Sequence, residues 1–257
     1  MSLSANTATA DSSYNNFSAF RTVKFVRKAN RGLKTSEVNG VKMKIYFLIY
    51  ETDGAGLLPF LSKGRLERAQ AAKSSAVRSR TIFSYALLRL ALMENFGMTE
   101  APEFGYEPHG KPFLKDFPNI FFSMSHAENA VLCAISEQPV GADVQDIRTL
   151  KADISSRICT PAELERLNAA DDKDRGLCRL WCLKESFGKL TGKGFSEGFT
   201  QIDTQKLLNE QKAFLTERGG FFISACTSSP ETAELRQVTE QELTSALYKS
   251  TRKGSNF

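Results

Sequence analysis

The sequence predicts an α+β fold, because strand-like and helix-like segments follow one another in an order that occurs twice. A strand, helices and a β-hairpin are expected within residues 43–139, and a similar series within residues 140–257. The 257 residues suffice for one large domain or two small ones. The 41% hydrophobic and 25% charged residues are typical of a soluble globular protein. We therefore expect an N-terminal half (43–139) and a C-terminal half (140–257).

The N-terminal half is expected to begin with a buried strand, because residues 43–50 form the apolar run MKIYFLIY. The segments expected after it are a helical stretch over 57–96 that is strongest at 79–92, a helix end at Gly97, a turn-rich link over 102–114, and a hairpin from the runs 120–125 and 130–136.

The C-terminal half is expected to begin with a strand over 140–147. Thr160, Pro161 and Glu163 predict the start of a helix, because they form a capping box with proline at the first helical position. A second helix is expected over 175–190. The remaining segments alternate like strands: 199–207, 219–228 and the final residues.

Positive charge is concentrated in residues 1–42, which carry seven Lys or Arg and two acids, whereas the rest of the chain is balanced. This segment is rich in Ser, Asn, Thr and Ala and is expected to be a disordered extension, either of transit type or preceding a true start at Met43. The basic pI therefore gives little support to nucleic-acid binding. The sequence contains no apolar run of about 18 residues, so no membrane-spanning helix is predicted. Five cysteines without a CxxC pair are expected to be buried free thiols in a reducing compartment.

The stretch WCLKESFGK (181–189) contains the only tryptophan and a dense group of charges. Glu185 and Lys189 are one helical turn apart, so an exposed helix with an ion pair is one interpretation and a phosphate-binding helix is another. The following run LTGKGF is not a Walker-type phosphate loop, because only three residues separate Gly188 from Gly192 and a helix precedes it. Its glycines are expected to end the helix.

Three further features contain candidate site residues. Asp143 and Gln145 share one strand face, where their oxygens suit Mg²⁺ or bonds to the backbone at a strand end. His126 follows a strand, and the lack of a GxSxG elbow favours phosphate binding, or an incidental loop position, over a hydrolase triad. A basic series is either a solvated helix face or a phosphate grip, and comprises Arg65, Arg68, Lys73, Arg78, Arg80 and Arg89.

Four motifs follow one another along the chain: Gly110-Lys111-Pro112, Ser123–His126, Gly141–Gln145 and Trp181–Lys189. In this order and spacing they resemble the 4′-phosphopantetheinyl transferase family, in its larger, monomeric, surfactin-synthetase-activating class. The resemblance extends over about Met43 to Phe199. It implies a pseudo-dimer of two similar α/β halves, with the active site in the cleft between them.

The resemblance also implies a reaction. Members of the family transfer the 4′-phosphopantetheine group of coenzyme A to a serine of an apo acyl or peptidyl carrier protein, require Mg²⁺, and release adenosine 3′,5′-bisphosphate. We therefore expect a cytoplasmic, monomeric enzyme without nucleic-acid or membrane partners. The alternatives are a degenerate relative that binds coenzyme A or carrier protein without turnover, and a nucleic-acid-binding protein that uses the basic tail.

The resemblance assigns roles to individual residues. The implied metal ligands are Asp143, Gln145 and Glu185, and the implied catalytic residues are Glu185, Lys189, Lys184 and Glu163, the last as general base. The implied coenzyme A contacts are Arg65, Arg68, Arg80, Lys111, Pro112, Ser125, His126, Lys184 and Lys189. Gln145 replaces the glutamate that the family often has, so weaker metal binding is expected. Phe195 and Phe199 are expected as apolar anchors for the carrier protein.

Overall fold

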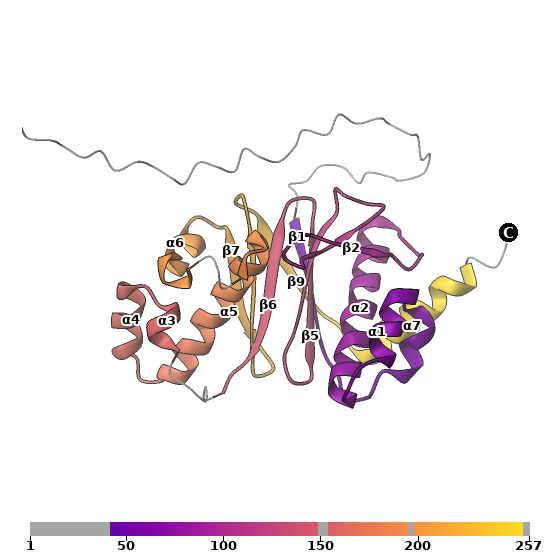
Figure 1. The fold of residues 1–257 in the computed structure, drawn as a ribbon, viewed down its shortest axis with the longest axis horizontal. Coiled ribbons are helices and arrows are strands. Elements are labelled where there is room, and N and C mark those ends of the chain that lie inside the picture. Colours follow the sequence, from indigo (N-terminus) through magenta and orange to yellow (C-terminus); the bar gives the residue numbers. More distant parts are fainter. Residues whose placement is uncertain (1–41, 149–153, 195–197, 254–257) are drawn as a thin grey trace, which may run out of the picture. The chain divides into compact units, whose positions relative to one another are not determined.

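The computed structural model describes residues 42–148, 154–194 and 198–253, all within the unit Ser36–Phe257 (Figure 1). The predicted extension lies outside the described residues, except for Lys42. The strands are β1 (Lys42–Ile49), β2 (Phe104–Tyr106), β3 (Pro112–Leu114), β4 (Phe121–His126), β5 (Ala130–Ser136), β6 (Val140–Asp146), β7 (Ala213–Arg218), β8 (Phe221–Thr227) and β9 (Thr232–Gln237). The helices are η1 (Ala55–Phe60), α1 (Lys63–Gln70), α2 (Ser75–Phe96), α3 (Ser155–Ile158), α4 (Pro161–Asn168), α5 (Lys173–Thr191), η3 (Phe199–Gln201), α6 (Thr204–Asn209) and α7 (Glu240–Lys253). Within these described ranges, no helix combines the length and the apolar character needed to cross a membrane.

The same topology occurs twice, which confirms the predicted α+β class. β1 is followed by the long helix α2 and the hairpin β4–β5, and β6 is followed by the long helix α5 and the hairpin β7–β8. In each case the second hairpin strand pairs antiparallel with the first strand of the series. The sheets have the orders β4-β5-β1-β9 and β6-β8-β7. Residues 232–253, which the predicted C-terminal half includes, return to the first sheet, because β9 pairs with β1 and α7 packs against α2.

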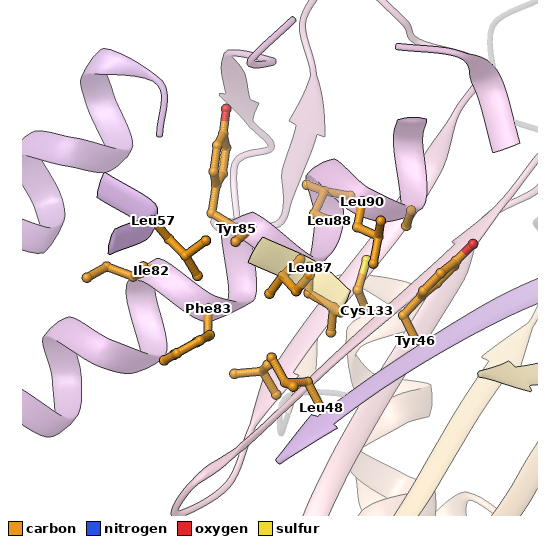
Figure 2. Packing of buried hydrophobic residues seen from close by; sticks show 14 of the residues in the cluster. Tyr46, Leu48, Leu57, Ile82, Phe83, Tyr85, Leu87, Leu88, Leu90 and Cys133 are labelled. Atoms are coloured by element: carbon orange, nitrogen blue, oxygen red, sulfur yellow. The ribbon is translucent and has the colours of Figure 1, made fainter. Parts of the chain in front are cut away.

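The sheets β4-β5-β1-β9 and β6-β8-β7 each lie between a helical layer and the other sheet, as the ribbon in Figure 1 shows. Because side chains alternate along a strand, one face of each sheet meets helices and the other face meets the second sheet. Ile45 and Phe47 of β1 belong to a cluster that also contains residues of β5, β6 and β8. The opposite face of β1 packs against α2, and Figure 2 shows Leu48 beside Phe83 and Leu87 in that cluster. Both faces of the central strands are therefore buried.

Several helix ends agree with the sequence. Gly97 ends α2 and Gly192 ends α5, both in the left-handed conformation with φ of 66° and 75°. The capping box of α4 is present, with Thr160 accepting from the Glu163 backbone and the Glu163 carboxylate accepting from the Thr160 backbone.

Three predicted segments are corrected by the structure. The helical stretch over 57–96 is divided into η1, α1 and α2. Residues 199–207 form no strand: η3 and the start of α6 are helical, and Asp203 between them caps α6 through the backbone N–H groups of Gln205 and Lys206. The final residues form β9 followed by α7, which starts where Thr239 and Glu242 exchange capping hydrogen bonds.

Helix α5 lies directly on the backbone of β6 at Gly141. A Cβ atom at this glycine would lie 2.1 Å from the Ser186 carbonyl oxygen and 2.2 Å from the Leu190 nitrogen. Both are backbone atoms of the helix, so no rotamer change relieves the overlap. The absence of a side chain at Gly141 therefore sets the distance between the strand that carries Asp143 and the helix that carries Glu185 and Lys189.

We expect Gly141→Ala to lower the free energy of unfolding by about 3 kcal/mol or more, because the added methyl group forces α5 away from β6. Urea titration followed by circular dichroism measures this change. The matched control is Gly56→Ala, where a Cβ would meet no atom within 4 Å. Equal stability of the two variants would contradict the close approach.

Candidate active site

Strands β4 and β6 and helix α5 meet at one polar cluster. The Lys189 ammonium donates to Asp143 Oδ1 at 2.6 Å and to Ser125 Oγ at 2.8 Å, and Ser125 Oγ donates to Asp143 Oδ1 at 2.7 Å. The neighbouring Ser123 Oγ accepts from the Ala142 backbone at 2.9 Å and so ties the edge of β6 to β4. The SMSH and GADVQ motifs, and the end of WCLKESFGK, are thus in direct contact.

Glu185 lies one turn before Lys189 on the same helix and is partly buried. Burial raises the pKa of Glu185, the negative charge of Asp143 raises it further, and Lys189 partly opposes both effects. Two carboxylates that repel one another in a partly desolvated place form a donor set that fits a hard divalent cation.

Gln145 follows Asp143 on the same face of β6 and is half-buried. Its Nε2 donates to the Asp146 carbonyl oxygen at 3.1 Å. Among the described residues, no group of three or more His, Cys, Asp and Glu side chains has the arrangement of a metal site.

A pocket of about 350 Å³ opens next to this cluster and is strongly cationic. Of the predicted coenzyme A contacts, it is lined by Arg65, Arg68, Arg80, Pro112, Ser125 and His126. Arg65 Nη2 donates to the Thr81 carbonyl oxygen at 3.1 Å, and its buried Nε has no hydrogen-bond partner within the described parts of the chain. Desolvation and the charges of Arg80 and Lys189 lower the pKa of His126.

Lys111 does not line this cationic pocket. A second pocket, of about 300 Å³, is lined by Lys111 and Lys189 and shares Pro112 with the first. The Lys111 ammonium, however, donates to the carbonyl oxygens of Leu190 at 2.9 Å and Val140 at 3.3 Å. It therefore fastens the β2–β3 hairpin to the last turn of α5, and burial lowers its pKa.

Lys184 and Glu163 do not join the cluster, although the resemblance makes them catalytic. They form an ion pair at 2.6 Å whose side chains are both 0% exposed. The Lys184 ammonium also donates to the carbonyl oxygens of Phe199 at 2.7 Å and Ile202 at 2.8 Å. An ammonium has three protons, so none remains for a phosphate, and a fully buried carboxylate cannot reach an acceptor serine. In the structure both side chains are thus fully engaged within the protein, and the catalytic roles that the resemblance implies stay predictions.

Two other expectations are corrected by burial. Phe199 is 2% exposed and packs edge-on against Trp181, so it cannot be an exposed anchor, and Phe195 lies outside the described residues. Arg89 is 5% exposed and donates to backbone carbonyls of Phe60 and Thr99, so it belongs to no solvated basic face. The expected free, buried state of all five cysteines is confirmed.

Several residues that line the first pocket were not expected from the sequence. They are Val77, Thr81, Ser84, Phe104, Tyr106 and Met124. The helical spacing of Val77, Thr81 and Ser84 around Arg80 was the signal that could have revealed the α2 wall. The hairpin residues Phe104 and Tyr106 gave no such signal, because a turn-rich link has no periodicity.

Comparisons with known proteins agree with this geometry. The model of the 4′-phosphopantetheinyl transferase superfamily matches residues 139–244. A 4′-phosphopantetheinyl transferase of Bacillus subtilis is 32% identical over 151 residues, which cover 53% of this chain and 67% of the relative. The 4′-phosphopantetheinyl transferase psf-1 of Bacillus pumilus is 30% identical, with 62% and 69% covered, and the transferase Sfp of Bacillus subtilis (strain 168) is 27% identical, with 60% and 72% covered. The chain belongs to the 4′-phosphopantetheinyl transferase family, and it is an enzyme of that class.

The buried pair predicts a specific pH dependence of stability. Burial raises the pKa of Glu163, but hydrogen bonds from Lys184, Thr204 and the backbone lower it more, so the pKa lies below its usual value of 4.5. A lowered pKa stabilises the fold above the unfolded value, and this stabilisation is lost as the pH falls through the folded pKa. We expect Glu163→Gln to have a shallower fall of Tm below about pH 4.5 than wild type.

Thermal melts followed by circular dichroism at a series of pH values test this expectation. Glu165→Gln is the control, because Glu165 is an exposed carboxylate of the same helix. The expectation fails if Glu163→Gln and wild type lose Tm in parallel on acidification.

Proposed function

We propose that this chain transfers the 4′-phosphopantetheine group of coenzyme A to a serine hydroxyl of an apo acyl or peptidyl carrier protein and releases adenosine 3′,5′-bisphosphate. The observation that carries the proposal is the direct contact between Asp143 and Lys189, both of which are hydrogen-bonded to Ser125 in the wall of a cationic pocket. A phosphate donor that enters this pocket would have its anionic groups against arginines and its reacting end beside Lys189. Membership of the transferase family supports the same reaction.

We propose that Asp143, Glu185 and the amide oxygen of Gln145 hold Mg²⁺. The ion would neutralise pyrophosphate charge when the substrate is bound. The donor set fits it, since both carboxylates are hard oxygen ligands and their mutual repulsion is relieved by a cation. Gln145 contributes no charge, so it serves as a weaker ligand than a glutamate.

The cationic side chains would divide the substrate between them. Arg65, Arg68 and Arg80 lie on α1 and α2 and would bind the phosphorylated adenosine end, with Pro112 beside the base. Ser125 and His126 would hold phosphate oxygens at the end of β4. Lys189 would contact the pyrophosphate oxygens and stabilise the negative charge that develops as the serine hydroxyl gives up its proton to water, its oxygen bonds to phosphorus and the bond to the leaving bisphosphate breaks.

We further propose that the site lies in a cleft between an N-terminal half (43–139) and a C-terminal half (140–257), since β4 belongs to the first range and β6 and α5 to the second. A cytoplasmic monomer without nucleic-acid or membrane partners is the setting that we propose. The five buried free thiols support a reducing compartment.

The transfer itself is tested by incubating the protein with coenzyme A, Mg²⁺ and a panel of apo carrier proteins. We expect the intact mass of at least one carrier to rise by one phosphopantetheine arm. Glu185→Ala should abolish this rise, because it removes a carboxylate from the cluster. No rise on any carrier, together with retained binding of coenzyme A, would support the degenerate, non-transferring relative instead.

The nucleotide pocket is tested by a pair of arginines from the same helix. We expect Arg80→Ala to raise the KM for coenzyme A about tenfold or more, because a charge-assisted contact to phosphate is lost. Arg78→Ala is the matched control, since Arg78 is exposed and does not line the pocket. Steady-state kinetics at saturating carrier protein provide both values. An equal KM in the two variants would place the nucleotide elsewhere.

A further inference from the structure

A buried ion pair outside the phosphate-binding cluster connects α5 to the chain that follows it. Both side chains are fully buried, and Lys184 bonds to the backbone of Phe199 and Ile202, which belong to an apolar cluster. Two charges lose their hydration in such a place, and well-packed apolar side chains of similar volume often give equal or greater stability. Stability alone therefore does not account for this pair.

The hydrogen bonds of the pair converge on one short segment, residues 199–204. Lys184 donates to the carbonyl oxygens of Phe199 and Ile202. Glu163 Oε1 accepts from the Thr204 backbone at 3.0 Å and from Thr204 Oγ1 at 2.6 Å. Directed bonds of this kind specify the path of a backbone, which apolar contacts alone do not.

The path of this segment affects the site, because Phe199, together with Gly194, lies against Gly188 of α5, the residue next to Lys189. A Cβ at Gly188 would lie 3.1 Å from Gly194 Cα and 3.3 Å from the Phe199 ring. Gly192 and Gly194 line the same pocket as Lys189. The nucleotide pocket, in contrast, is lined by residues of α1, α2, β4 and the β2–β3 hairpin, and by none of this segment.

We propose that Lys184 and Glu163 are positioning residues that hold residues 199–204 against α5, and thereby hold the wall of the pocket beside Lys189 where the acceptor serine enters. The inference rests on the proposed function, because it concerns the protein that accepts the transferred group. In this proposal Lys184 does not contact phosphate and Glu163 is not the general base. Both residues instead hold the acceptor side of the site in place from within the protein.

The test uses the double variant Lys184→Met/Glu163→Leu, which removes both charges at nearly constant volume. We expect a Tm close to that of wild type and a Kd for coenzyme A within about twofold, because the nucleotide pocket is distant from the change. The kcat/KM for the carrier protein should fall about ten- to hundredfold. Hydrogen exchange, read by mass spectrometry, should become faster over residues 199–204. Lys206→Met, an exposed lysine of α6, is the control and should change none of these values.

The inference is wrong if the folded double variant has the same kcat/KM for the carrier protein as wild type. It is also wrong if kcat falls without faster exchange over 199–204, which would return Glu163 to the role of base. If the double variant does not fold, Thr204→Val decides, because it removes only the hydroxyl bond to Glu163. It should speed exchange and lower kcat/KM, and unchanged values would reject the proposal. Failure of wild type to modify any carrier would count against the proposed function, whereas the exchange result would still test the pair.

Discussion

The close packing of α5 on β6 at Gly141 is the contact on which the rest of the site depends. A backbone-to-backbone approach of this kind brings side chains of a helix and a strand within hydrogen-bond distance, which larger residues prevent. Asp143 follows Gly141 by two residues and so projects from the same face of β6. Lys189 consequently reaches Asp143 and Ser125 directly, and Glu185 lies close enough for its pKa to respond to Asp143.

Two of the lysines on helix α5, Lys184 and Lys189, have opposite environments. Lys189 remains 31% exposed at the pocket, where its charge is available to a ligand. Lys184 is completely buried, and its ammonium donates all three protons to acceptors within the protein. A third lysine, Lys111, reaches the last turn of α5 from the β2–β3 hairpin, where a cation is favourable beside the unpaired carbonyls of a helix end. Lys184 and Lys111 thus connect α5 to neighbouring segments, and Lys189 is the lysine that faces the pocket.

The two repeated series of elements explain why the cationic pocket and the carboxylate cluster adjoin. The edge strand β4 of one sheet meets the edge strand β6 of the other, and Ser123 joins them by accepting from the β6 backbone. Arginines from α1 and α2 therefore line a pocket that also contains Ser125, the hydrogen-bond partner of Asp143 and Lys189. This arrangement suits an anionic substrate. The arginines would face its anionic groups, and the carboxylates would hold a cation only at the point where bonds form and break.

The sequence by itself determined the class of fold, the strands at residues 43–50 and 140–147, the capped helix ends and the motifs that meet at Asp143 and Lys189. These follow from local rules, since the side-chain period and capping chemistry act over a few residues. Only the tertiary structure decided the partners of Lys184, the helical form of η3 and α6 and the return of β9 and α7 to the first sheet. The reason is physical: a local pattern shows which face a side chain occupies, but burial and long-range pairing decide what that face meets.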